Sequence, residues 1–390
     1  MRLGIVHPSL NRCGGAERVC LGAIKALVMG GFKVRLYTLE RVEWGSLEER
    51  FGYLTRPNEE SWLMERLPIR GEHSLEFYTS TLFPYLLLRP RWDGERGLVF
   101  STYGDLAESL TDISYINAIP LRLSHLYPGL NPMYRRLASR LYDLFLKGLE
   151  GLLGRGLMLT NSRFMQGLLK RRMGYETLLV YPPVEVGRFY SSLEEDREDI
   201  ILTISRLRRG KNLDFVTRVA ERVEDGEFII LGLADQASER PLEALEKAIR
   251  DERLKDRVKI LVNQPLDKIM AILSSAKVYL HTQPMEAFGI SVVEAMASGC
   301  IPVVPRLGGP WTDILEMREG YYGFSYRCVE EAVARIRMIL RDEKMRREVS
   351  IRTRSRAKDF DASIFERKIL RIIKKLSQTP SQINSSSKRY

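Results

Sequence analysis

The stretch KVYLHTQPMEAFGISVVEAMASG, residues 277–299, decides the fold class because it holds one complete unit of strand, loop and helix. Its first seven residues are rich in strand-forming side chains and predict a buried strand that ends near Gln283. The loop PMEAFG follows, and the apolar run ISVVEAMAS predicts a helix that ends at Gly299. A strand that leads directly into a helix is the building unit of parallel sheets.

The same unit recurs along the chain. Residues 2–40 predict a strand, a glycine-containing turn, a helix and a second strand. Strands separated by helices resume at residues 200–207, 227–234 and 257–264. Two such series predict an α/β protein with two Rossmann-like, doubly wound domains, in which ligands bind at the carboxyl ends of the strands.

A break in the pattern indicates the domain boundary. Pro182 and Pro183 are incompatible with a central strand or helix, and a charged run follows them. We therefore expect a first domain at 1–182, a linker at 183–199 and a second domain at 200–359.

The C-terminal part predicts one more helix, up to residue 376. Ser363 and Glu366 have the spacing of a capping box, and apolar residues recur on one face of the following turns. The opposite face is rich in lysine and arginine, so the helix either packs on the protein or lies on a membrane surface. Residues 377–390 are polar and without periodicity, which predicts a disordered tail.

The composition narrows the class of protein. Of the 390 residues, 44% are hydrophobic and 28% are charged, as in a folded soluble protein. The initial apolar run is too short for a signal peptide, and no run reaches the roughly 18 apolar residues of a membrane span. The four cysteines lack metal-ligand spacing and fit buried side chains in a reducing compartment. We expect a cytoplasmic protein, either free or peripheral on the inner face of a membrane.

The net charge of +11 implies attraction to an anionic partner: nucleic acid, anionic lipid or a phosphorylated substrate. The basic residues are scattered and no aromatic platform is interleaved with them, so we expect no nucleic acid.

Two acids stand eight residues apart in the nearly uncharged stretch. Glu286 falls in the loop, and Glu294 falls inside the following helix. A carboxylate can accept hydrogen bonds from a vicinal diol, so the pair suits a ligand with two sets of hydroxyls. Gly289 lets the backbone amides from Phe288 to Ile290 approach an anion or a sugar oxygen closely. Alternatively, the two acids are surface groups, with Glu286 paired to a basic neighbour.

Further loops at strand ends suit phosphate. Arg206 and Lys211 can clamp a diphosphate, unless they are ordinary surface charges. Gly308, Gly309 and Pro310 form another turn before a helix, in the segment 306–314. Gly14 and Gly15 form a similar turn in the first domain, in the segment 13–17.

These motifs, in this order, resemble glycosyltransferase family 4, a family of retaining sugar-nucleotide enzymes of the GT-B fold. The glutamates match its E-x7-E signature, SRLRRGK resembles its R-L-x-x-x-K element, and HPSLNRCGGAERV, NSRF and VYPPVE match its other landmarks. The resemblance covers nearly the whole chain. It implies an acceptor-side first domain, a nucleotide-sugar-binding second domain, and a C-terminal helix at 360–376 that crosses back to the first domain.

The resemblance also implies roles for individual residues. Arg206 and Lys211 would hold the donor diphosphate, Glu294 the ribose and Glu286 the transferred sugar, with Arg206, Lys211 and Glu286 as the catalytic set. The implied donor-binding residues are Gly14, Gly15, Arg206, Lys211, Glu286, Ala287, Phe288, Gly289, Ile290 and Glu294. No metal or further cofactor is expected, because two cations and helix ends can neutralise a diphosphate and no D-x-D cluster occurs in a plausible loop.

Two residues of the first domain are further candidates for contact with the acceptor or the sugar. Where the family commonly has a histidine before a proline, this chain has Asn117. Asparagine can hydrogen-bond a sugar hydroxyl but cannot exchange a proton near neutral pH. His7 either contacts the substrate or shapes the glycine turn.

Within the family, the motifs are most similar to those of members that add alpha-1,2-linked mannose to a dolichol-linked oligosaccharide on the cytoplasmic face. This implies GDP-mannose as the donor and a lipid-linked glycan as the acceptor. Residues 132–152 predict a helix with an apolar face flanked by basic residues, which either packs on the sheet or contacts the membrane. The alternatives are a transferase that uses a UDP-sugar for another glycan or glycolipid, and a non-catalytic GT-B scaffold.

Overall fold

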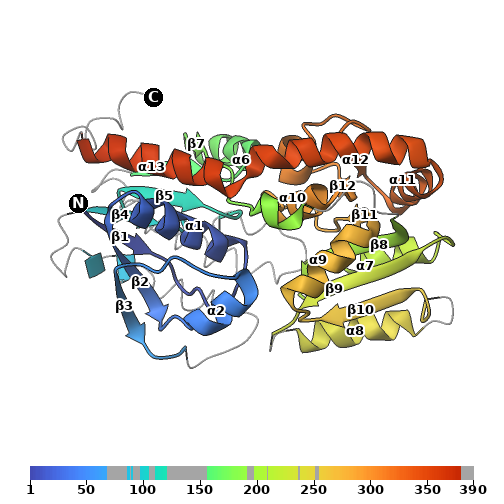
Figure 1. Ribbon diagram of the computed structural model, residues 1–390, viewed down its shortest axis with the longest axis horizontal. Coiled ribbons are helices and arrows are strands. Elements are labelled where there is room, and N and C mark those ends of the chain that lie inside the picture. The colour runs from blue at the N-terminus through green and yellow to red at the C-terminus, as the bar shows by residue number, and fades with distance from the viewer. Residues whose placement is uncertain are drawn as a thin grey trace. The chain divides into compact units, whose positions relative to one another are not determined.

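The computed structural model describes residues 1–67, 86–87, 89–90, 97–104, 110–120, 156–190, 197–208, 210–235, 238–250 and 254–378. The chain divides into two compact units (Figure 1). Unit 1 comprises Met1–Pro183 and Ala362–Tyr390, and unit 2 comprises Val184–Asp361. The predicted pair of α/β domains is confirmed.

Unit 1 is built on a parallel sheet with the strand order β3-β2-β1-β4-β5-β6-β7. The described elements are β1 (Arg2–Val6), α1 (Gly15–Met29), β2 (Lys33–Glu40), α2 (Trp44–Phe51), β3 (Glu59–Met64), β4 (Leu98–Ser101), β5 (Ile113–Ile116), β6 (Leu157–Thr160), α6 (Arg163–Met173), β7 (Leu178–Leu179) and α13 (Ala362–Gln378).

Helix α13 packs along α1, as predicted for the last helix (Figure 1). Its buried residues Phe365, Ile369 and Ile373 belong to the same apolar cluster as the core-facing side of α1. The predicted capping box is wrong, because the helix begins at Ala362 and Ser363 therefore lies inside its first turn. Glu366 instead forms an ion pair with Lys25 of α1, at 2.8 Å.

Unit 2 is built on a second parallel sheet, with the strand order β10-β9-β8-β11-β12-β13. Its described elements are η3 (Val186–Phe189), β8 (Glu198–Arg206), α7 (Asp214–Ala220), β9 (Glu227–Leu233), α8 (Glu239–Ile249), β10 (Val258–Val262), α9 (Leu266–Ser275), β11 (Ala276–Leu280), α10 (Ile290–Ser298), β12 (Ile301–Pro305), η4 (Pro310–Ile314), β13 (Phe324–Tyr326), α11 (Val329–Arg341), α12 (Glu343–Ala357) and η5 (Lys358–Phe360).

Each sheet reverses its direction of growth at one place. In unit 1 the strand sequence turns back between β1 and β4, and in unit 2 it turns back between β8 and β11. The loops at the carboxyl ends of such neighbouring strands run to opposite faces of the sheet and leave a crevice, where ligands of open α/β sheets bind. The strand order thus gives each unit one preferred place for a ligand.

The segment predicted as a linker is divided differently in the structure. The boundary falls after Pro183, and residues 184–199 are counted with unit 2. Val186 and Phe189 of η3 are buried, and the Phe189 carbonyl accepts a hydrogen bond from the Ser298 hydroxyl of α10 at 3.0 Å. Apolar side chains and a backbone contact therefore attach this segment to unit 2.

Two sequence-based expectations lie outside the described residues: the amphipathic helix at 132–152 and most of the tail, residues 379–390. Within the described part of the chain, no helix is both long and apolar enough to cross a bilayer.

Candidate functional site

The loops that follow β8 and β11 meet at the point where the sheet of unit 2 reverses. The Lys211 ammonium lies 3.3 Å from Glu286 Oε2 and also donates to the side-chain oxygen of Gln283. The Lys211 and Glu286 side chains are 30% and 22% exposed, so both are reachable by a ligand yet partly shielded from water. The structure thus brings together a predicted diphosphate-binding cation and a predicted sugar-binding acid.

Two further hydrogen bonds hold the loops to each other. Thr282 Oγ1 donates to the Lys211 carbonyl at 2.8 Å, and Asn212 Nδ2 donates to the Thr282 carbonyl at 3.0 Å. Because each loop is fixed through the backbone of the other, Lys211 and Glu286 are positioned before a ligand arrives. Such preorganisation lowers the cost of binding and catalysis.

Glu286 is held in its ionised form. Burial alone would raise its pKa, but the Lys211 ammonium and then His281 lower it, and the pKa ends below the ordinary value for glutamate. Its Oε1 also accepts the Ala287 N–H at 3.2 Å. An ionised carboxylate is an acceptor only, which suits it to receive hydrogen bonds from hydroxyl groups.

The glycines after β12 support the Glu286 loop. Gly309 N–H donates to the Glu286 carbonyl at 2.8 Å, so this amide is occupied rather than open to a phosphate. Gly308 has a φ of +102°, and a Cβ there would lie 2.8 Å from the Glu286 carbonyl oxygen. Only glycine combines that backbone conformation with so close an approach.

The two residues that follow Glu286 keep their side chains inside the protein. The side chains of Ala287 and Phe288 are buried, and Phe288 packs edge-to-face on Phe360. Gly289, at φ +100°, precedes Ile290, the first residue of α10. At this positive φ a glycine allows the chain to turn sharply into the helix.

Glu294 lies inside α10 and is only 6% exposed. Tyr279 of β11 is within electrostatic range of both glutamates: burial raises the pKa of Tyr279 above its usual range, and the Glu294 and Glu286 carboxylates raise it further. The Tyr279 hydroxyl is 2.7 Å from Ser291 Oγ of α10. The sequence analysis overlooked Tyr279, although alternation along the strand places it on the face toward α10.

Arg206 is the last residue of β8, in register with Leu233 of β9. It therefore lies at the same carboxyl edge of the sheet as the Lys211 loop. Its neighbour Arg208 forms an ion pair with Asp235, so the basic residues of this segment have different partners.

In unit 1 the candidate residues also gather at the point of reversal. Gly14 is the N-cap of α1, and its N–H donates to Glu17 Oε2 at 2.7 Å. The buried His7, next after β1, has its Nε2 3.9 Å from Glu17 Oε1 and its Nδ1 3.0 Å from Thr102 Oγ1. Burial lowers the pKa of His7, but Cys20 and Glu17 raise it to about 9. His7 thus lies beside Glu17, whose carboxylate accepts the N–H of the glycine turn.

Asn117 belongs to the same polar group. Its side-chain amide donates to the Thr102 carbonyl at 2.6 Å, and its own carbonyl accepts from the Asn161 side chain at 2.6 Å. Thr102, which the sequence analysis overlooked, connects His7 and Asn117. Its only signal in the sequence is its place at the end of a strand.

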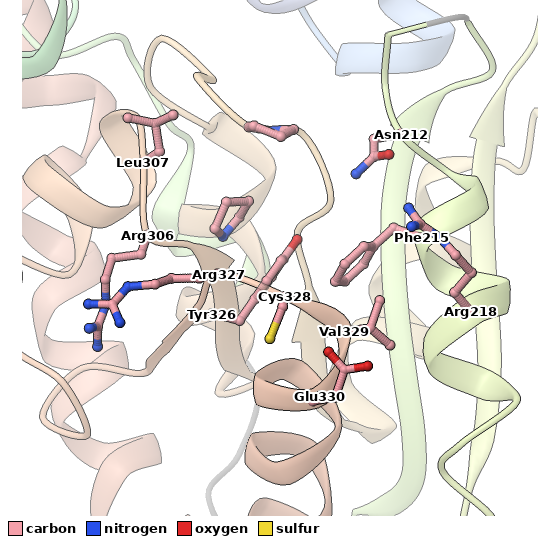
Figure 2. A pocket seen from close by; sticks show the side chains of 12 residues that line it. Asn212, Phe215, Arg218, Arg306, Leu307, Tyr326, Arg327, Cys328, Val329 and Glu330 are labelled. Atoms are coloured by element: carbon pink, nitrogen blue, oxygen red, sulfur yellow. The ribbon is translucent and has the colours of Figure 1, made fainter.

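A concavity with a volume of about 540 Å³ lies beside the β11 loop (Figure 2). Phe215 and Tyr326 form its aromatic wall with stacked rings 4.7 Å apart, and Asn212 and Pro284 belong to the loops of the Lys211–Glu286 contact. The Tyr326 hydroxyl donates to the His281 carbonyl at 2.8 Å. This wall therefore also supports the loop that carries Glu286.

The described residues include no group of three histidine, cysteine, aspartate or glutamate side chains placed to hold a metal ion. The four cysteines are free.

Residues 189–356 match the family model of glycosyl transferases group 1. This segment contains the Lys211–Glu286 contact and Glu294. Among the curated relatives, the GDP-Man:Man(3)GlcNAc(2)-PP-Dol alpha-1,2-mannosyltransferase of Dictyostelium discoideum is 31% identical over 242 residues, which are 58% of this chain and 48% of the relative. The Homo sapiens protein of the same name is 27% identical over 63% of this chain and 54% of the relative. The chain spans about half the length of these curated relatives.

Among solved structures, Anabaena Alr3699/HepE in complex with UDP aligns with a TM-score of 0.71 at 17% sequence identity, over 96% of this chain and 100% of that chain. At this identity the similarity concerns the fold. The chain therefore carries a glycosyl transferases group 1 domain, within a pair of parallel-sheet α/β units of the GT-B fold.

Proposed function

We propose that the protein is a retaining mannosyltransferase that transfers mannose from GDP-mannose to a lipid-linked glycan. The observation that carries this proposal is the Lys211–Glu286 contact at the point of reversal of unit 2, inside the group 1 domain. A cation and an ionised acid held side by side suit a ligand that carries phosphate next to sugar hydroxyls. The named activity of the Dictyostelium and human relatives supports GDP-mannose as the donor.

In this proposal each side chain acts on a different part of the donor. Lys211, together with Arg206, stabilises the charge that develops on the diphosphate as the bond to the sugar C1 breaks and its electron pair goes to the leaving phosphate oxygen. Glu286 accepts hydrogen bonds from the transferred sugar, and Glu294 from the ribose. Each charge-assisted hydrogen bond contributes roughly 1.5 to 3 kcal/mol, which corresponds to about 10- to 150-fold in rate or affinity.

The acceptor hydroxyl passes its proton to the leaving diphosphate as its oxygen bonds to the same face of C1. We assign acceptor binding to unit 1, where Gly14, Thr102 and Asn117 lie in the segments that follow β1, β4 and β5 at the carboxyl edge of the sheet. Because a lipid-linked acceptor is anchored in a bilayer, the transfer would take place at a membrane surface. We place it on the cytoplasmic side.

A thermal-shift panel tests the donor class. Wild type and Glu294→Gln are compared with GDP, UDP, ADP, GDP-mannose, UDP-glucose and UDP-N-acetylglucosamine. We expect a shift with GDP and GDP-mannose that the variant loses, because a ligand at a hundred times its Kd stabilises by about 2.7 kcal/mol. Glu246→Gln, on the exposed face of α8, is the matched control and should behave as wild type.

The other outcomes point to the alternatives. A shift confined to the UDP ligands would replace the mannosyl donor with a UDP-sugar. No shift with any nucleotide, and no transfer of labelled mannose to a polyprenyl-diphosphate oligosaccharide, would favour a non-catalytic scaffold.

A further inference from the structure

His281 is the first residue after β11, and its backbone is fixed on both sides. Its N–H donates to the Val303 carbonyl of β12 at 2.9 Å, and its own carbonyl accepts the Tyr326 hydroxyl at 2.8 Å. The first of these bonds extends the pairing of β11 with β12 by one residue beyond the strand. The backbone that carries the imidazole is therefore held in place at the carboxyl edge of the sheet.

Alternation along the strand determines the face on which the imidazole lies. Val278 and Leu280 belong to the core cluster on the side of α7 and α11. Tyr279, between them, points to the opposite face, where its hydroxyl meets Ser291 of α10. His281 is two residues beyond Tyr279 and shares its face, because side chains alternate along a strand with a period of two. It therefore lies on the α10 side of the sheet.

The surroundings keep this imidazole neutral. The side chain is 7% exposed, and burial lowers the pKa of His281 to about 4, with Glu286 acting to raise it and Lys211 to lower it. His281 is thus close enough to both members of the Lys211–Glu286 contact for their charges to be felt. At neutral pH its ring has one nitrogen that donates and one that accepts.

The Nε2 atom of this ring is fully buried and has no hydrogen-bond partner among the described residues. A buried polar atom without a partner is costly, and such atoms in folded proteins call for an explanation such as a ligand. The neighbouring Tyr279, by contrast, has its hydroxyl bonded to Ser291. The ring that carries this atom is within electrostatic range of Lys211 and Glu286, the two groups assigned to the donor.

We propose that His281 is a further contact for the donor sugar, with Nε2 hydrogen-bonded to a hydroxyl of the hexose that Glu286 also holds. This inference rests on the proposed function, because it requires a sugar next to Glu286. A neutral imidazole and a carboxylate on neighbouring hydroxyls would fix the orientation of the ring. They would also reject a donor that lacks the contacted hydroxyl, since Nε2 would then remain unpaired.

The test compares His281→Leu, which removes the polar atom at similar volume, with His281→Gln, whose side-chain amide can replace Nε2. With the nucleotide sugar that stabilises wild type, we expect His281→Leu to lower kcat/KM by about 2- to 13-fold, the range that one neutral hydrogen bond supplies. The thermal midpoint without ligand should be unchanged or higher, and the shift with the free nucleoside diphosphate should be retained. His281→Gln should restore part of the lost activity.

A second readout concerns specificity and would not respond to a purely structural role. Wild type should discriminate between the intact donor and at least one of its monodeoxy analogues, and His281→Leu should lose that discrimination. Equal turnover of wild type and His281→Leu would overturn the inference. A fall in stability that accompanies the fall in activity, with unchanged discrimination, would also overturn it and make His281 a structural histidine. If wild type binds no nucleotide in the thermal-shift panel, the proposed function itself fails. Because that panel precedes the comparison of variants, this failure is distinguished from a failure of the inference about His281.

Discussion

At the scale of single residues, the candidate site depends on a few groups whose charge state is set by their neighbours. Glu286 is ionised because Lys211 lies beside it, and His281 is neutral because it is buried. Neither state is a property of the residue type alone. Changing one neighbour should therefore change the chemistry of another.

The Lys211–Glu286 pair should show coupling in a double-mutant cycle. Lys211→Met and Glu286→Gln should each lower kcat/KM by about 10- to 150-fold, since each removes a charge-assisted contact. The double variant should lose less than the product of the two, with a coupling of about 0.5 to 3 kcal/mol, because the residues touch each other and share one ligand.

Arg208→Met is the matched control for this cycle. It removes a cation from the same loop, but one that pairs with Asp235. Its effect on kcat/KM should be small. Strictly additive effects of Lys211→Met and Glu286→Gln would contradict a shared ligand.

His281 should also influence stability between pH 4 and 6.5. Its pKa is lowered to about 4 in the folded protein from the ordinary value of 6.5, so the unfolded chain binds the proton first as the pH falls. The free energy of unfolding is therefore not reduced by His281 above pH 6.5. It falls as the pH drops toward 4, by about 1.4 kcal/mol for each unit by which the pKa differs between the folded and the unfolded chain. His7, with its raised pKa, has the opposite sign and acts between pH 6.5 and 9.

The measurement is the thermal midpoint from pH 4 to 8 for wild type and His281→Gln. The variant should show a flatter slope between pH 4 and 6.5 and should match wild type in slope above that range. Parallel curves over the whole range would show that the imidazole is not held neutral. The lowered pKa of Glu286 acts below the ordinary value of 4.5 and so leaves the range from pH 4.5 to 6.5 to His281.

At the scale of elements, loops determine the site and the strands hold the loops in place. Hydrogen bonds attach the Glu286 loop to the turn at Gly308 and Gly309 and to the Lys211 loop. None of these supports is a ligand contact in itself. A change in a support should therefore affect ligand binding indirectly.

Gly308→Ala should weaken donor binding without removing a contact. The added Cβ would lie 2.8 Å from the Glu286 carbonyl oxygen, at a φ of +102° that a side chain adopts only with strain. We expect a loss of about 1 to 3 kcal/mol in stability, together with a rise in the Kd of the nucleotide sugar, as the Glu286 loop is pushed away.

Gly174→Ala separates the two causes. Gly174 also has a positive φ, +69°, but a Cβ there would meet nothing within 4 Å. This variant should lose stability only, with donor affinity unchanged in isothermal titration. Equal donor affinity in Gly308→Ala and wild type would show that the glycine turn does not position Glu286.

At the scale of the whole molecule, the chain returns to unit 1 for its last helix. Helix α13 (Ala362–Gln378) follows unit 2 in the sequence but packs into the core of unit 1. The stability of unit 1 therefore depends on residues more than 300 positions from α1 in sequence.

Ile369→Ala tests this dependence. Ile369 is fully buried in the cluster shared with α1, so the cavity should cost unit 1 about 2 to 5 kcal/mol. Urea unfolding should show an earlier transition, while the nucleotide-dependent shift, which we assign to unit 2, persists. Ile351→Ala, on the exposed face of α12, is the control and should leave both transitions in place. An unchanged urea transition in Ile369→Ala would mean that α13 is dispensable for unit 1.

The sequence by itself determined the features that neighbouring residues specify. The strand-loop-helix units, the glycine before α10, and the placement of Glu286 in a loop and Glu294 in a helix depend on periodicity and on local backbone conformation. The capping of the last helix was predicted wrongly, because a one-residue shift of the helix start decides which side chain is the cap.

The tertiary structure alone decided which of these residues meet. Lys211 and Glu286 are 75 residues apart, and His7 and Thr102 are 95 apart. Their contacts depend on strand order, which local patterns do not encode: it is fixed by how whole strands and helices bury their apolar faces together. The unpartnered Nε2 atom of His281 is also visible only in the tertiary structure. Whether a buried polar atom has a hydrogen-bond partner depends on every element that packs around it.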